Sequence, residues 1–152
     1  DNTGKENKEF AKKILLEANA LGLGDHIMLG LRDLSEDEKV LLYNASDVVL
    51  MPFMCPTAVD PPISLLEAMA CGSVVVASKV QSIPYIVRHR ENGFLISSVT
   101  VDQLYETLRI TIEDSDKLVE VREKARIKIL NEFSLENAVR KLLGFYSIVK
   151  IA

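Results

Sequence analysis

Two short, almost uninterrupted apolar runs, Val48–Phe53 and Val74–Ser78, constrain the fold of this chain more than any other feature. Runs of this composition are typical of strands that are covered on both faces, as the strands of parallel sheets are. Helical patterns precede and follow both of them. Alternating strands and helices predict an α/β domain with a Rossmann-like parallel sheet and helices on both faces.

The remaining elements follow from hydrophobic periodicity and from capping residues. An apolar stripe predicts a helix over residues 5–21, and Ile27–Gly30 is expected to be a strand. A capping box that starts at Ser35 predicts a helix to Asn44. A helix is also expected from Pro61 to Gly72, because proline suits a first helical turn. The other expected elements are a short helix at 83–88, a strand at 94–96, and helices at 100–113, 116–132 and 135–149.

The order of these elements is unusual for a nucleotide-binding sheet. Such sheets begin with a strand and a glycine-rich turn and have about six strands, whereas this chain begins with a helix and shows three or four. We therefore expect residues 1–152 to form a single, partial domain that lacks its first strands.

Composition excludes several classes of protein. The net charge is −4, with 18 basic and 22 acidic residues, which argues against a broad nucleic-acid surface. No apolar run approaches the ~18 residues of a membrane span. The two cysteines and two histidines lack the spacing of a zinc site, and no carboxylates cluster, so we expect no metal.

The segment that follows the first apolar run has the features of a binding site. Ligands of open α/β sheets lie at the carboxyl ends of strands, and a helix N-terminus suits a phosphate. Asp60 is the expected N-cap of the following helix, and helical spacing places Asp60, Ser64 and Glu67 on one stripe. Glu67 is a lone carboxylate among apolar residues, so it either binds ligand hydroxyls, meets a nearby amide or base, or points outward.

The run LLEAMACG at Leu65–Gly72, followed by Val74–Ser78 and then Ile83-Pro84, closely resembles the C-terminal domain of family 4 glycosyltransferases. These are retaining enzymes of GT-B architecture, with two Rossmann-like domains. The resemblance extends over most of the chain and implies a domain that binds a nucleotide diphosphate sugar.

The resemblance also implies roles for particular residues. Glu67 matches the glutamate that binds the ribose hydroxyls. The family's other glutamate, which binds sugar hydroxyls, falls on Val59 here, so the neighbouring Asp60 either supplies that catalytic-site carboxylate or only caps the helix. The family's glycine-rich step between the two glutamates is replaced around Pro62, and the amides of Ile63 and Ser64 are left to contact the diphosphate.

Other positions are less informative. Arg32, in the loop after the first expected strand, either contacts base or phosphate or is simply solvated. The family's Gly-Gly before Ile-Pro is Gln81-Ser82 here, and its following acidic residue is Tyr85, so the sequence offers no assignment of donor specificity. His89 lies in a small basic cluster that reads as a solvated helix end.

The implied protein is a hexosyl-type glycosyltransferase that moves a sugar from a nucleotide diphosphate sugar to a hydroxyl acceptor with retention, without a cofactor. Its partners would be that donor and an N-terminal acceptor domain, which these residues do not include. We expect these residues alone to be inactive, and expect a cytoplasmic location, with peripheral association at the inner membrane face if the acceptor lies at a membrane surface. Two alternatives stay open: another GT-B enzyme, such as an epimerase or phosphorylase, or a non-catalytic α/β partner-binding module.

Overall fold

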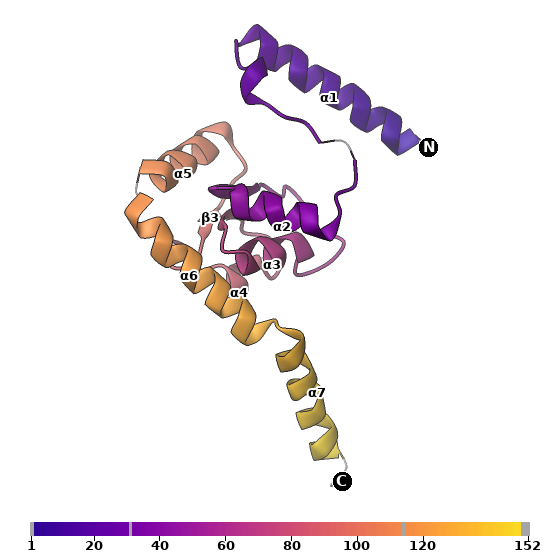
Figure 1. Cartoon of the computed structure of the whole chain (residues 1–152), viewed down its shortest axis with the longest axis vertical. Helices are drawn as coiled ribbons and strands as arrows, with labels where there is room; N and C mark the ends of the chain where they lie inside the picture. The colour runs from indigo at the N-terminus through magenta and orange to yellow at the C-terminus, as the bar shows by residue number, and fades with distance from the viewer. Residues whose placement is uncertain (1, 31, 114, 150–152) are drawn as a thin grey trace. The chain divides into compact units, whose positions relative to one another are not determined.

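The computed structural model describes residues 2–30, 32–113 and 115–149, and Figure 1 shows the elements along the chain. The chain divides into two compact units, Asp1–Ser35 and Glu36–Ala152. The second unit contains the sheet that the sequence predicts.

The first unit consists of one long helix and a short connecting segment. Helix α1 spans Asn2–Ala20, and Ala11 and Ala18, seven residues apart and hence on one side of the helix, are buried. Gly22, with φ of 72°, reverses the chain after the helix, and a single 3-10 turn, η1, follows at Gly24–His26.

The strand expected at Ile27–Gly30 is not formed, so that prediction was wrong. A strand needs a neighbour to satisfy its backbone amides and carbonyls. The described residues of the first unit contain no other strand that could pair with this segment. Met28 is 94% exposed, which shows that apolar character alone did not bury the segment.

The second unit is built on a three-stranded parallel sheet in the order β1-β2-β3. The strands are β1 (Val48–Met51), β2 (Val74–Ser78) and β3 (Phe94–Ile96). Val48 pairs with Val74, and Val76 pairs with Phe94. Every residue of the central strand β2 is buried, as the apolar run predicts.

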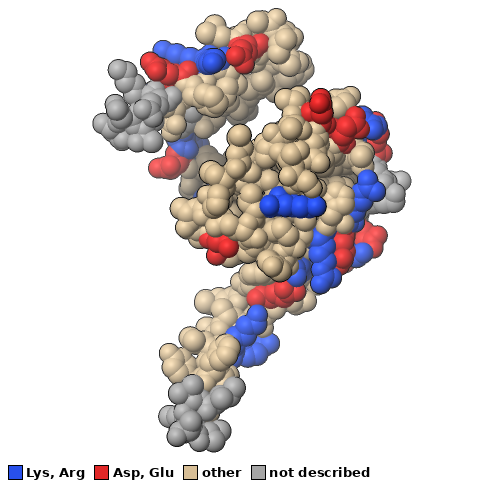
Figure 2. Space-filling view, turned by 180° about the vertical axis from the view of Figure 1, so that it is seen from behind, with Lys and Arg blue, Asp and Glu red and all other residues tan. Residues whose placement is uncertain are grey.

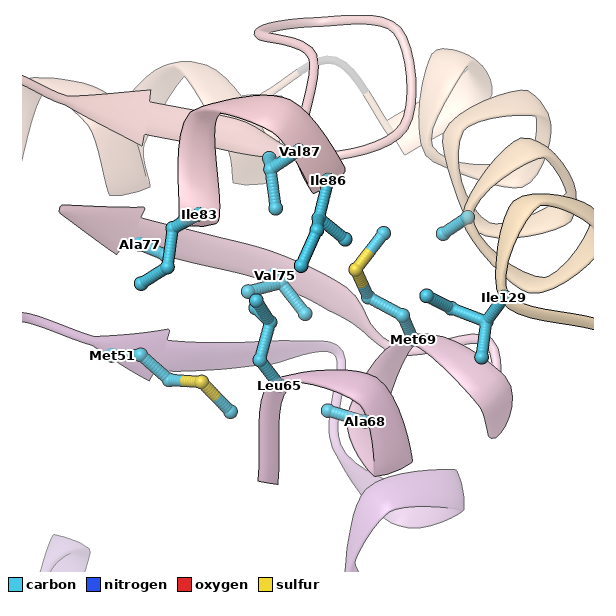
Figure 3. Close-up of a cluster of buried hydrophobic side chains, with 11 residues drawn as sticks. Met51, Leu65, Ala68, Met69, Val75, Ala77, Ile83, Ile86, Val87 and Ile129 are labelled. Carbon is cyan, nitrogen blue, oxygen red and sulfur yellow. The ribbon is translucent and has the colours of Figure 1, made fainter. Parts of the chain in front are cut away.

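Helices cover both faces of this sheet, which confirms the predicted fold class. On one face, helices α3 (Ile63–Ala70), α4 (Ile83–Ile86) and α6 (Ser115–Glu132) pack against Val75 and Ala77 (Figure 3). On the other face, helix α5 (Val101–Glu113) and the start of α6 pack with Val74 and Val76. The largest cluster contains Met51, Leu65, Ala68, Met69, Val75, Ala77, Ile83, Ile86, Val87, Ala125 and Ile129.

Two further helices complete the unit. Helix α2 (Glu36–Ala45) packs beside α3, and the Ser73 hydroxyl donates to the Tyr43 carbonyl at 2.7 Å. Helix α7 (Leu135–Val149) begins after Ser134, whose Oγ accepts a hydrogen bond from the Asn137 amide at 3.3 Å. Ser134 therefore caps this helix, as the sequence predicts.

Charged side chains of both signs lie side by side on the face shown in Figure 2. The described helices also carry ion pairs one helical turn apart, such as Arg109 with Glu113 at 2.7 Å and Lys128 with Glu132 at 2.9 Å. Among the described helices, none is both long and apolar enough to cross a bilayer.

Candidate functional site

The carboxyl ends of β1 and β2 lead into two loops, residues 52–62 and 79–82, that are joined by hydrogen bonds. Because the strands are parallel neighbours, both loops leave the same edge of the sheet. The Thr57 amide donates to Oε1 of Gln81 at 2.7 Å, and Nε2 of Gln81 donates to the Thr57 carbonyl at 3.3 Å. We call residues 52–62 the donor loop, because the predicted donor-binding residues begin at its end.

Asp60 lies in the donor loop and is exposed to solvent. Its Oδ1 accepts two hydrogen bonds from Ser82, one from the amide at 3.2 Å and one from the hydroxyl at 2.6 Å. Asp60 is therefore held by the loop after β2 and not by the helix that follows it in sequence.

Two predictions about Asp60 were wrong. The N-cap of α3 is Pro62, with no side-chain capping bond, so Asp60 does not cap the helix. Helix α3 begins at Ile63 and not at Pro61, because a residue that precedes a proline is disfavoured in the helical conformation. Asp60 consequently does not share a helical stripe with Ser64 and Glu67, although those two lie one turn apart on α3.

The N-terminus of α3 presents backbone donors at the end of the donor loop. The Pro62 carbonyl accepts the Leu65 amide at 3.0 Å, and Pro62 has no amide hydrogen to offer. Among the described hydrogen bonds, none uses the amides of Ile63 or Ser64, and both residues are exposed. These two amides, together with the positive end of the helix dipole, form an arrangement that suits an anion.

Glu67, one turn further along α3, is engaged by two residues of helix α2. Oε1 of Glu67 lies 3.6 Å from Nζ of Lys39, and the Tyr43 hydroxyl donates to Oε2 at 3.4 Å. The Glu67 side chain keeps 31% of its surface exposed. Of the readings left open by the sequence, the structure shows the one in which the carboxylate meets a base.

The two partners of Glu67 have shifted pKa values. Burial, followed by the charge of Glu67, raises the pKa of Tyr43, so its hydroxyl keeps the proton that it donates. A hydrogen bond with Glu36, at 2.6 Å, is the main reason why the pKa of Lys39 is raised, and Glu67 adds to it. Lys39 is thus a fixed cation shared between two carboxylates.

Sequence reasoning missed Lys39 and Tyr43. They are four residues apart on a helix that the capping box at Ser35 had located, which places both on one side of it. The spacing predicts that the two side chains lie on one side of the helix. It does not predict that Glu67 is the residue they contact.

Arg32 belongs to the first unit. Its Nη1 donates to the Asp33 carbonyl at 3.2 Å, and the side chain is exposed. It lines a hollow of about 410 Å³ with residues of α1, including Phe10 and Ile14, and with Gly30. None of the described contacts tests whether Arg32 meets the base or a phosphate, so that contact stays a prediction.

The His89 side chain contacts two residues of strand β3. Its Nδ1 accepts the Leu95 amide at 3.0 Å, and its ring packs edge-to-face on Phe94, with ring centres 5.9 Å apart. Burial is the main cause of its lowered pKa, and the charges of Arg90 and Lys79 lower it further.

Among the described residues, no three His, Cys, Asp or Glu side chains are grouped closely enough to hold a metal ion. The described polar groups of this region are the Asp60 carboxylate and the α3 amides at the strand ends, and the Glu67 carboxylate with its Lys39 partner on α3 and α2.

The parallel sheet, its helices on both faces and the polar loops at the strand ends define a Rossmann-like α/β domain. The family model described as "Glycosyl transferases group 1" matches residues 3–128. The chain belongs to this family of glycosyltransferases, whose fold is GT-B.

Curated relatives support this membership. The chain is 33% identical to the alpha-maltose-1-phosphate synthase of Mycolicibacterium smegmatis over 101 residues, which is 62% of this chain and 26% of that enzyme. It is also 33% identical to the putative colanic acid biosynthesis glycosyltransferase WcaL of Salmonella typhimurium, over 76% of this chain and 29% of WcaL. The chain thus spans less than a third of the length of these relatives.

Solved structures share the fold. Alr3699/HepE of Anabaena, in complex with UDP and glucose, superposes with a TM-score of 0.78 at 24% identity, covering 93% of this chain and 37% of HepE. The C-terminal domain of the group 1 glycosyl transferase LpcC of Francisella tularensis superposes with a TM-score of 0.70 at 24% identity, covering 84% of this chain and 64% of that domain.

Proposed function

We propose that this chain is the donor-binding part of a retaining glycosyltransferase of family 4 that transfers a hexosyl group from a nucleoside diphosphate hexose to a hydroxyl acceptor. The observation that carries the proposal is the position of Glu67 on α3. It is a partly exposed carboxylate one turn from two helix-terminal amides that suit a phosphate, in a chain whose LLEAMACG run resembles the family's donor-binding segment.

In this proposal each part of the site meets one part of the donor. Glu67 accepts hydrogen bonds from the ribose hydroxyls. The amides of Ile63 and Ser64 bind the diphosphate, with Pro62 shaping the turn that presents them. Asp60 accepts hydrogen bonds from sugar hydroxyls, and Arg32 contacts the base or the phosphates.

The chemistry asked of these residues is electrostatic. As the bond between the sugar C1 and the diphosphate oxygen breaks, negative charge grows on the leaving diphosphate. Donors already aimed at that charge stabilise it without reorganising. The bond from C1 to the acceptor oxygen forms as the hydroxyl proton passes to the leaving diphosphate, and the proposed step uses no metal or cofactor.

The acceptor site is proposed to lie outside these 152 residues, in an N-terminal domain, since the chain matches less than a third of its curated relatives. In this proposal the acceptor is presented at a membrane surface, with the protein at the cytoplasmic face. We expect these residues alone to transfer no sugar.

Product analysis tests this proposal. The intact protein that carries this chain is incubated with UDP-glucose, ADP-glucose or GDP-mannose and a panel of hydroxyl acceptors, and the products are followed by NMR. We expect a glycoside whose anomeric configuration is that of the donor. An inverted product, an epimerised donor or release of sugar phosphate would refute it, and binding of none of the donors would leave the non-catalytic module as the function.

A further inference from the structure

The loop after β2 holds the donor loop at two points, through Gln81 and Ser82. We propose that these two side chains form a clamp in which Ser82 is the positioning residue that aims Asp60 at the hexosyl group of the donor. The inference rests on the proposed function, which it deepens by naming the residues that set the geometry of the sugar subsite.

Ser82 stands at the N-cap of α4, where a serine hydroxyl ordinarily accepts a hydrogen bond from the helix. Here it makes no side-chain capping bond. Its amide and its hydroxyl both donate to Oδ1 of Asp60, at 3.2 Å and 2.6 Å. The hydroxyl therefore serves the carboxylate and not the helix.

This arrangement leaves the other carboxylate oxygen available. Among the described hydrogen bonds, none involves Oδ2 of Asp60, and the residue is exposed. A carboxylate has about four acceptor positions on its two oxygens. With Oδ1 fixed by two donors, the direction of Oδ2 is fixed as well, and a sugar hydroxyl is a donor that suits it.

Gln81 holds the donor loop through Thr57, whose hydroxyl lies 3.0 Å from Oε1 of Gln81 and donates to it. Its side-chain amide pairs with both the amide and the carbonyl of Thr57, as a neighbouring strand would. Gln81 has φ of 46°, in the left-handed region that disfavours a residue with a side chain. At this position the side chain makes contacts with Thr57 that a glycine could not make.

The clamp should strengthen binding of the sugar part of the donor and leave binding of the nucleotide part unchanged. A donor loop held in place before the ligand arrives needs less ordering on binding. Glu67 lies on α3 and is held by α2, outside the clamp. Loss of the clamp should therefore weaken binding of UDP-glucose while leaving binding of UDP unchanged.

Calorimetry on the intact protein tests this with Ser82→Ala. We expect affinity for UDP-glucose to fall about tenfold and affinity for UDP to change less than twofold, with KM for UDP-glucose rising to match. Ser82→Thr, which keeps the hydroxyl, should restore most of the affinity. The matched control is Ser46→Ala, which removes a hydroxyl that donates to the Leu42 carbonyl at 2.6 Å before β1; both affinities should then be unchanged.

Gln81→Gly separates the clamp from the backbone conformation. Glycine accepts the positive φ at no steric cost, so a purely conformational role predicts unchanged or tighter binding. The clamp predicts weaker UDP-glucose binding, by about fivefold, at an unchanged or raised melting temperature. Equal changes for UDP and UDP-glucose, or no change for either, in the Ser82 and Gln81 variants would overturn the clamp alone. Failure of the unsubstituted protein to bind UDP would overturn the proposed function, and the clamp with it.

Discussion

Removal of the Glu67 carboxylate tests the proposed nucleotide site most directly. Glu67→Ala takes away both oxygens, and Glu67→Gln keeps one acceptor oxygen and the size of the side chain while removing the charge. If Glu67 binds the two ribose hydroxyls of a nucleoside diphosphate, both variants should weaken that binding, with alanine the more severe.

The magnitude follows from the partners that Glu67 already has. Two hydrogen bonds from hydroxyls to a charged acceptor contribute about 1.5–3 kcal/mol each. Before ligand binds, the carboxylate meets Lys39 at 3.6 Å and Tyr43 at 3.4 Å, and both contacts are at the long end of the useful range. Giving them up offsets about half of the gain. We therefore expect Glu67→Ala to cost about 2–3 kcal/mol, which is about 30- to 150-fold in Kd for UDP.

The assay is calorimetric titration of UDP into the intact protein and its variants. Glu67→Gln should lose about half as much binding free energy as Glu67→Ala. The control is Glu120→Gln, which removes a carboxylate paired with Lys124 on the exposed side of α6 and should leave Kd unchanged. A Kd within twofold of the unsubstituted protein for Glu67→Ala, with an unaltered thermal transition, would remove Glu67 from the site.

Three further predictions concern stability and the sugar subsite. Met69→Ala removes a fully buried side chain from the main core, so chemical denaturation should show a loss of about 2–5 kcal/mol; a loss below 1 kcal/mol would mean that the cluster is not packed as described. Asp60→Asn should leave the melting temperature unchanged, since Asp60 caps no helix, but should weaken UDP-glucose binding; a lower melting temperature with unchanged binding would refute this. Because the folded-state pKa of His89 is below its ordinary value of 6.5, the unfolded chain binds the proton more readily, and unfolding free energy should fall as pH drops through about 6.5; His89→Gln should flatten that fall, and an unchanged pH profile would contradict it.

Much of the fold could be predicted because its cause is local. The apolar runs at Val48 and Val74 became the paired strands β1 and β2, and capping residues such as Ser134 located helix starts, since a hydroxyl satisfies amides only three residues away. The strand expected at Ile27–Gly30 failed for the opposite reason. A strand is stable only beside another strand, and composition cannot supply the neighbour.

For the candidate site, the sequence by itself determined which residue types were present and that a helix would start just after the first strand's loop, although α3 begins at Ile63 and not at Pro61. It also marked Glu67 as a carboxylate that needed a partner. Only the tertiary structure decided which residues the two carboxylates contact. Glu67 contacts Tyr43, which is 24 positions away in sequence, and Asp60 contacts Ser82, which is 22 positions away. Asp60 looked like a helix cap because aspartate before a helix usually is one. It is held instead by Ser82, because adjacent parallel strands bring the loops at their carboxyl ends together, whatever their separation along the chain.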